Sequence, residues 1–171
     1  LDNDSKNRVV SSLIHQHCGV WAMSQKIEGL VESSANLGIL RIDDKQVILH
    51  FSIRSSVQTV KEYMKELIVN QISMLGGKVN INSQYPAWEY KTESKLREKM
   101  TDVYQRMYGE QMKVEAVHAG LECGILSAKC PELDCVSFGP QMFHIHTPKE
   151  KLSISSTGRV WNYLVAILAE K

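Results

Sequence analysis

The sequence has few cysteines, and this scarcity argues against two classes of small domain. It contains four cysteines in 171 residues, and no two of them form a CxxC pair. A disulfide framework and a cysteine-type zinc site both need more cysteines at closer spacing. We therefore expect a cytoplasmic protein with reduced thiols.

The sequence also lacks an excess of charge and a long apolar run. Its 20 basic and 19 acidic side chains give a formal net charge of +1, which provides no electrostatic attraction to nucleic acid or to an anionic membrane. No apolar stretch approaches the ~20 residues that a membrane-spanning helix needs. We therefore expect an ordinary globular chain, with neither nucleic acid nor a membrane as its partner.

The apolar pattern of residues 1–90 predicts an α+β unit. Asp43-Asp44-Lys45 separates two strand-like runs and has the composition of a hairpin turn. Ser56 is the expected N-cap of the helix that follows. The β-β-α-β order is three-quarters of a ferredoxin-like unit, an antiparallel sheet with helices on one face. The expected elements are a short helix ending near Gly19, strands at 30–42 and 46–52, a helix at 57–75 and a strand at 78–82.

The pattern of residues 91–171 predicts an alternating α/β unit with a mostly parallel sheet. About 80 residues are few for such a sheet, because both of its faces need to be covered. We therefore expect further strands from a segment outside this sequence. The expected elements are a helix from 92 to 107 closed by Gly109, a strand at 112–118, a helix at 120–129, a strand at 135–138 and a helix from 155 to 168.

The segment GPQMFHIHTPKE, residues 139–150, is the most informative part of the sequence. It is rich in turn-forming residues and follows a short apolar run, so we expect it at the carboxyl edge of the sheet, where α/β proteins usually bind ligands. The spacing of His144 and His146 would place both imidazoles on one side of an extended segment. A neutral imidazole can bind zinc, although loop histidines are more often hydrogen-bonded or solvated. Spacing alone leaves both interpretations open.

A second segment, HAGLECG at residues 118–124, combines glycines with a predicted helix start. Backbone N–H groups at such a start can hold a carboxylate. Glu122 is favoured there by the helix dipole, which is a purely structural explanation of its presence. The glycines can equally serve tight turns, so the pattern itself does not identify a ligand loop.

Taken together, the motifs resemble a known family. HAGLECG at 118–124 and DCVSFGPQMFHIHTPKE at 134–150 closely resemble the aminoacyl-histidine dipeptidases (peptidase D). These belong to the dinuclear zinc peptidases, with carboxypeptidases, tripeptidases and carnosinase-like enzymes. LVESSANLGIL at 30–40, FSIRSS at 51–56 and YPAWEY at 85–90 resemble their lid domain, in the same order. The resemblance spans residues 19–171.

The resemblance implies a domain organisation and a set of site residues. Residues 1–90 would form the C-terminal part of a ferredoxin-like lid domain, which serves dimerisation and substrate binding. Residues 91–171 would form the C-terminal part of an α/β catalytic domain. The implied site residues are His146 as the C-terminal zinc ligand, Arg54 on the substrate's carboxylate through its guanidinium fork, Gly120 in the substrate-binding loop and Glu122 beside it, with His144 near the site or facing solvent.

The resemblance further implies hydrolysis of Xaa-His dipeptides with two zinc ions, or other divalent metals, in a cytoplasmic homodimer. The family's other metal ligands and its general base come from an HxD motif, an aspartate and a Glu-Glu pair. This sequence contains neither HxD nor Glu-Glu, and it has no match for the family's lid histidine. We therefore expect no catalytic residue in this chain, and we expect the missing N-terminal part of the same protein to provide them.

Two further hypotheses fit the same motifs. A related family member that acts on another dipeptide or on an N-acyl amino acid would share them, and its lid pocket would distinguish it. A non-catalytic ferredoxin-like module for dimerisation or peptide binding would carry a relict catalytic segment. An intact metal motif upstream in the gene would favour the enzyme over the module.

The missing ligands lead to a direct prediction. A catalytic zinc takes about three protein ligands, whereas the resemblance gives this chain only His146. The 171-residue polypeptide, purified and loaded with zinc, is expected to release no histidine from β-alanyl-histidine above a buffer control. Robust hydrolysis by this polypeptide alone would contradict the assignment.

Overall fold

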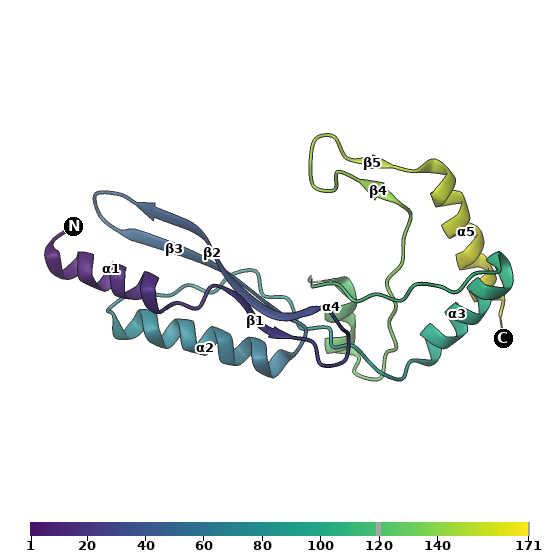
Figure 1. The fold of residues 1–171 in the computed structure, drawn as a ribbon, viewed down its shortest axis with the longest axis horizontal. Helices are drawn as coiled ribbons and strands as arrows, with labels where there is room; N and C mark the ends of the chain where they lie inside the picture. The colour runs from purple at the N-terminus through teal and green to yellow at the C-terminus, as the bar shows by residue number, and fades with distance from the viewer. Residues whose placement is uncertain (119–120, 171) are drawn as a thin grey trace. The chain divides into compact units, whose positions relative to one another are not determined.

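The computed structural model describes residues 1–118 and 121–170, which form two compact units (Figure 1). The first unit comprises Leu1–Tyr90 and Ala116–Pro131, and the second comprises Lys91–Glu115 and Glu132–Lys171. The first unit is therefore discontinuous in the sequence. The assignment of residues 1–90 to a lid and of the remainder to a catalytic domain stays a prediction.

The first unit is built on a three-stranded antiparallel sheet in the order β1-β2-β3. Its two long strands and their hairpin confirm the sequence prediction. Asp43 Oδ1 closes the turn by accepting hydrogen bonds from the backbone N–H groups of Lys45 and Gln46, at 2.8 and 2.9 Å. The elements of this unit are α1 (Asn3–His15), β1 (Gly19–Met23), β2 (Val31–Ile42), β3 (Val47–Ser55), α2 (Gln58–Met74) and α4 (Glu122–Lys129).

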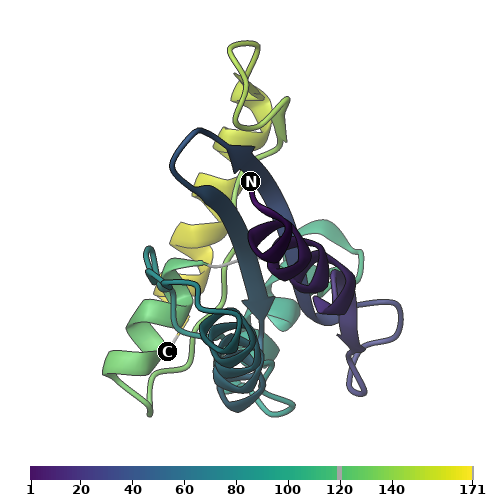
Figure 2. The same ribbon diagram turned by 90° about the vertical axis from the view of Figure 1, so that its left-hand side faces the viewer.

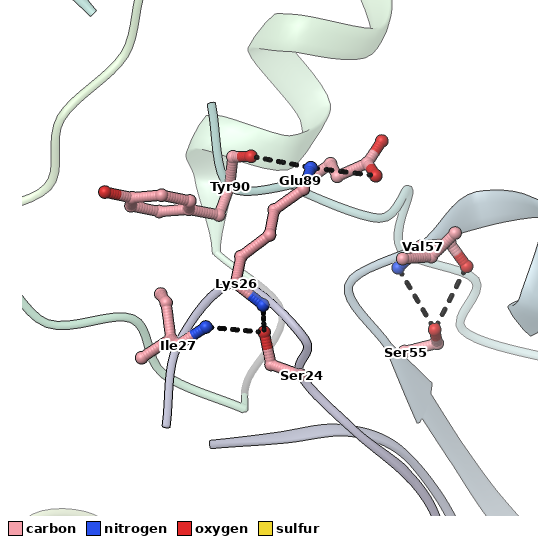
Figure 3. Close-up of polar contacts among 7 residues, drawn as sticks. All are labelled: Ser24, Lys26, Ile27, Ser55, Val57, Glu89 and Tyr90. Atoms are coloured by element: carbon pink, nitrogen blue, oxygen red, sulfur yellow. Dashed lines mark hydrogen bonds and ion pairs between the residues drawn. The ribbon is translucent and has the colours of Figure 1, made fainter. Parts of the chain in front are cut away.

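The structure differs from the sequence prediction at three points in this unit. The short strand β1 was not expected, and it adds the third strand to the sheet. Residues 78–82 form no strand, because no neighbouring strand in the described residues pairs with them. The N-cap of α2 is Val57, not Ser56, and it has no side-chain capping bond. Ser55 Oγ instead bonds to the N–H and carbonyl of Val57, at 3.1 and 3.0 Å (Figure 3).

A small apolar core fastens α2 to one face of this sheet. Ala35 of β2 and Met64 of α2 are fully buried, and Ile68 is nearly so. Side chains alternate between the two faces along a strand, so Ser34 points to the face opposite Ala35. The helix α2 therefore covers the face that carries Ala35 and not the face that carries Ser34.

A β-bulge between Leu37 and Ile39 shifts the register of β2 against β3 by one residue. If the register next to the turn continued unchanged, Arg54 would lie opposite Ala35. Beyond the bulge Arg54 lies opposite Ser34 instead. Residues directly opposite in an antiparallel pair share one face of the sheet, so Arg54 points away from the core under α2.

On the other side of the bulge the hairpin continues as two strands only. β1 pairs with residues 31–35 of β2 and leaves the rest of the hairpin to β2 and β3. Figures 1 and 2 show this dark blue hairpin extending past β1 to its turn. The three-stranded part of the sheet is therefore the end that carries Ser34 and Arg54.

The connection between β1 and β2 is fastened to residues 89–90 (Figure 3). Lys26 Nζ donates to the carbonyl of Tyr90 at 3.5 Å and lies 3.8 Å from Glu89 Oε1. Ser24 Oγ accepts hydrogen bonds from the N–H groups of Lys26 and Ile27, both at 3.2 Å, which keeps the connection compact. This contact holds the end of the YPAWEY motif to the connection between β1 and β2.

The helix α4 packs against the same motif. A Cβ atom added at Gly124 would meet the carbonyl oxygen of Pro86 at 2.9 Å and the Cβ of Trp88 at 3.4 Å. Glycine is therefore the residue that lets the backbones approach this closely. The second glycine of HAGLECG thus has a packing function, and it brings two of the family motifs into contact.

The second unit packs two antiparallel-paired short strands and two helices. The helices confirm the prediction, and α3 ends at Gly109 with φ 72°. Its core contains Met100, Val103, Tyr163 and Ile167. Tyr163 donates its hydroxyl to the carbonyl of Met100 at 2.7 Å, and burial raises the pKa of Tyr163 to about 12. The elements are α3 (Lys95–Tyr108), β4 (Met142–Phe143), β5 (Lys151–Leu152) and α5 (Ile154–Ala169).

The two strands predicted at 112–118 and 135–138 are absent from the described residues of this region. Their apolar residues have another use, since Met112 and Val136 pack against the core between the helices. The expected parallel sheet is therefore not formed within the described chain. None of the helices in the described residues is long and apolar enough to cross a membrane.

The core under the sheet leads to a stability prediction. Met64 and Met74 both lie in α2, but Met64 is fully buried whereas Met74 is 88% exposed. Met64→Ala is expected to lower the free energy of unfolding by about 2–5 kcal/mol, because it leaves a cavity. Met74→Ala is the matched control and should change it by less than about 0.5 kcal/mol. Urea denaturation measures both, and equal effects would contradict this core.

Candidate functional site

The expected substrate residue Arg54 lies at the end of β3 with an exposed side chain. Its Nη1 donates to the backbone carbonyl of His118 at 3.3 Å. A guanidinium has five N–H donors, so this bond leaves most of the fork unused. Among the described residues, no carboxylate forms an ion pair with Arg54. The strand thus presents an exposed cation without an acidic partner in the described chain.

His118, whose carbonyl accepts the hydrogen bond from Arg54, is itself bonded to the sheet. His118 Nε2 and Ser34 Oγ are hydrogen-bonded at 2.7 Å. Burial lowers the pKa of His118, and the nearby Arg54 cation lowers it further, while a backbone hydrogen bond with Val31 acts in the opposite direction. The imidazole is therefore neutral at pH 7. Ser34, Arg54 and His118 form one polar cluster on the sheet face away from α2, which we call the Arg54 cluster.

Two predicted residues follow His118 in the HAGLECG motif. Glu122 is the first residue of α4, and its side chain is exposed. This position is the one that the helix dipole favours for an acidic side chain. Gly120 lies outside the described residues. The structure therefore brings Arg54 to the beginning of the HAGLECG motif.

The predicted zinc ligand His146 lies in the loop between β4 and β5 of the second unit. His144 and His146 have φ angles of 53° and 65°, so the expected extended segment with both imidazoles on one side is wrong. The chain turns instead, because Thr147 Oγ1 donates to the carbonyl of His144 at 2.7 Å. Glu150 Oε2 also accepts from the backbone N–H of His146 at 2.8 Å. The side chain of His146 is exposed.

The residues that the structure describes do not form a complete metal site. In the described residues, no group of three His, Cys, Asp or Glu side chains comes close enough to hold a metal ion. A catalytic zinc needs about three protein ligands. His146 is an exposed imidazole that fits one coordination position, but the described residues do not fit a zinc ion by themselves.

Ser34 and His118 were not predicted as site residues. His118 opens the HAGLECG motif, and this was the available signal for it. No local signal marks Ser34, because its position opposite Arg54 depends on the bulge in β2. The Arg54 cluster therefore becomes visible only once the strand register is known.

Comparison with known proteins agrees with the motifs. No protein-family model matches the chain. The chain is 33% identical to the cytosol non-specific dipeptidase of Escherichia coli K12 over 152 aligned residues. The aligned region covers 89% of this chain and 31% of that protein. The chain thus spans about a third of the length of this curated relative.

Two solved structures have a similar fold. The match to the aminoacylhistidine dipeptidase of Vibrio alginolyticus covers 98% of this chain and 34% of that protein's chain, with a TM-score of 0.84 and 29% identity. The aminopeptidase PepT of Bacillus cereus ATCC 10987 matches 95% of this chain and 44% of its own, with a TM-score of 0.69. At 17% identity the second shows the fold alone. The predicted mixture of helices and strands is confirmed. So is the resemblance that the motifs indicated: the chain is similar, over nearly all of its length, to about one third of an aminoacyl-histidine dipeptidase.

Proposed function

We propose that this chain is part of a zinc-dependent dipeptidase that hydrolyses Xaa-His dipeptides in the cytoplasm. The similarity to two dipeptidases supports the peptide substrate, and the name of the Vibrio relative, aminoacylhistidine dipeptidase, supports histidine as the second residue. The word cytosol in the name of the Escherichia coli relative supports the location. The remaining two thirds of such a protein would provide the catalytic groups that this chain lacks.

The observation that carries the proposal is the exposed Arg54 at the start of the HAGLECG motif. Every dipeptide ends in a free carboxylate, and the planar guanidinium fork binds a carboxylate through two parallel hydrogen bonds. We assign Arg54 to this carboxylate. Gly120 is assigned to the substrate-binding loop and Glu122 to a position beside it.

His146 is proposed as one ligand of the zinc site. A left-handed backbone at a residue other than glycine costs roughly 1–3 kcal/mol and persists at functional positions where the surroundings enforce it. Here Glu150 and Thr147 hold such a turn and leave the imidazole exposed. The other ligands of two zinc ions, or of other divalent metals, would come from residues outside this sequence. We further propose that the complete protein is a homodimer.

A second substrate range is favoured by one comparison. The Escherichia coli relative is named a non-specific dipeptidase, which supports a wider choice of second residue. The choice between the two follows from the rates at which the complete protein cleaves alanyl-histidine and alanyl-leucine. A strong preference for alanyl-histidine supports the histidine-specific proposal, and equal rates support the wider range.

The ligand assignment is tested in the complete protein with zinc. His146→Ala is expected to lower histidine release from β-alanyl-histidine by at least about 100-fold and to lower the bound zinc, because a site with few ligands does not tolerate the loss of one. His144→Ala is the matched control, since His144 lies in the same loop with the same left-handed backbone. Equal activity of the His146→Ala variant and the wild type would remove His146 from the site.

The role of Arg54 is tested through the substrate's carboxylate. Arg54→Gln is expected to lower kcat/KM for a dipeptide about 10- to 100-fold, mainly through KM, because a charged hydrogen bond is lost. The amide of the same dipeptide, which has no carboxylate, should be cleaved equally by both proteins. Arg41→Gln on β2 is the control, as Arg41 is also exposed on the hairpin. An unchanged preference for the free acid in Arg54→Gln would refute this role.

A further inference from the structure

The Arg54 cluster contains more than the arginine that the substrate needs. His118 joins two strands through two different atoms: its ring nitrogen bonds to Ser34 of β2, and its carbonyl accepts from Arg54 of β3. Ser34 and Arg54 are directly opposite each other across these strands. The three residues therefore form a closed set in which each one restrains the next.

The restraint acts on the direction of the guanidinium. A long arginine side chain at an exposed strand end would otherwise sample many rotamers, and fixing it costs conformational entropy. A carbonyl on Nη1 removes part of this freedom before any ligand arrives. The carbonyl of His118 can do so only while the residue stays in place, and its ring is held by the 2.7 Å hydrogen bond to Ser34 together with a backbone hydrogen bond with Val31.

We propose that His118, held by Ser34, is a positioning residue that aims Arg54 at the carboxylate of the substrate. The proposal rests on the proposed function, in which Arg54 binds that carboxylate. Neither Ser34 nor His118 needs to touch the substrate. Their effect is to orient the guanidinium of Arg54 before the substrate binds. Less conformational entropy is then lost when the carboxylate is bound.

The charge of the cluster agrees with this division of roles. Burial and the Arg54 cation both lower the pKa of His118, so the imidazole carries no charge at pH 7. Within the cluster Arg54 is then the only charged side chain. A neutral imidazole bonds to Ser34 without competing for the carboxylate, whereas a charged one would offer it a second cation.

The test compares four variants of the complete protein with zinc: Ser34→Ala, Ser34→Thr, His118→Ala and His118→Gln. Ser34→Ala and His118→Ala are expected to raise KM for the free-acid dipeptide about three- to tenfold, as expected for the loss of one hydrogen bond, and to leave kcat nearly unchanged. The dipeptide amide should show no such rise. Ser34→Thr keeps the hydroxyl, and His118→Gln supplies a side-chain amide that can bond to the hydroxyl of Ser34. Both variants should therefore recover most of the loss in KM.

Coupling to Arg54 separates positioning from a general structural effect. In an Arg54→Gln background, Ser34→Ala should raise KM no further, because there is no guanidinium left to aim. Ser52→Ala is the matched control, as Ser52 is an exposed serine on the same face of β3. It is expected to change neither KM nor kcat.

Three results would overturn the positioning role alone. The first is an equal rise in KM for acid and amide, and the second is a full additional effect of Ser34→Ala in the Arg54→Gln background. The third is an unchanged KM in Ser34→Ala and His118→Ala, while Arg54→Gln still loses the preference for the acid. That result leaves the proposed function intact. An unchanged acid preference in Arg54→Gln itself would overturn both the function and the positioning role.

Discussion

The register between β2 and β3 determines which side chains meet at the candidate substrate site. A one-residue shift along a strand turns every side chain to the opposite face. Without the bulge at Gly38, Arg54 would share a face with Ala35, where α2 fills the space with Met64. With the bulge it shares a face with Ser34, whose hydroxyl is hydrogen-bonded to His118. The carboxylate-binding role proposed for Arg54 depends on this irregularity.

The parts of the first unit that could be predicted have local causes. The Asp43 turn and the helix α2 depend on residues close together in the sequence, and both are present as expected. The bulge was not predicted, because a glycine inside a strand indicates a bulge only when its partner strand is known. The pairing of Ser34 with His118 was also beyond prediction, since 84 residues separate them.

In the second unit, apolar composition was mistaken for strand formation. A strand exists only through its neighbours, whereas an apolar run can also pack against helices. Met112 and Val136 lie in such runs and contribute to the core beside α3 and α5. The predicted role of His146 came from the family resemblance. Its local geometry was missed because two left-handed histidines within three residues are uncommon.

The discontinuity of the first unit has a consequence for the order in which the molecule is made. The sheet and α2 emerge from the ribosome before residue 91, but α4 and His118 follow only after α3 has been synthesised. Closing the intervening loop costs little extra entropy, since that cost grows only with the logarithm of loop length. The contact between Arg54 and His118 can therefore form only after residues 91–115 have been synthesised, on a sheet whose strands are already complete.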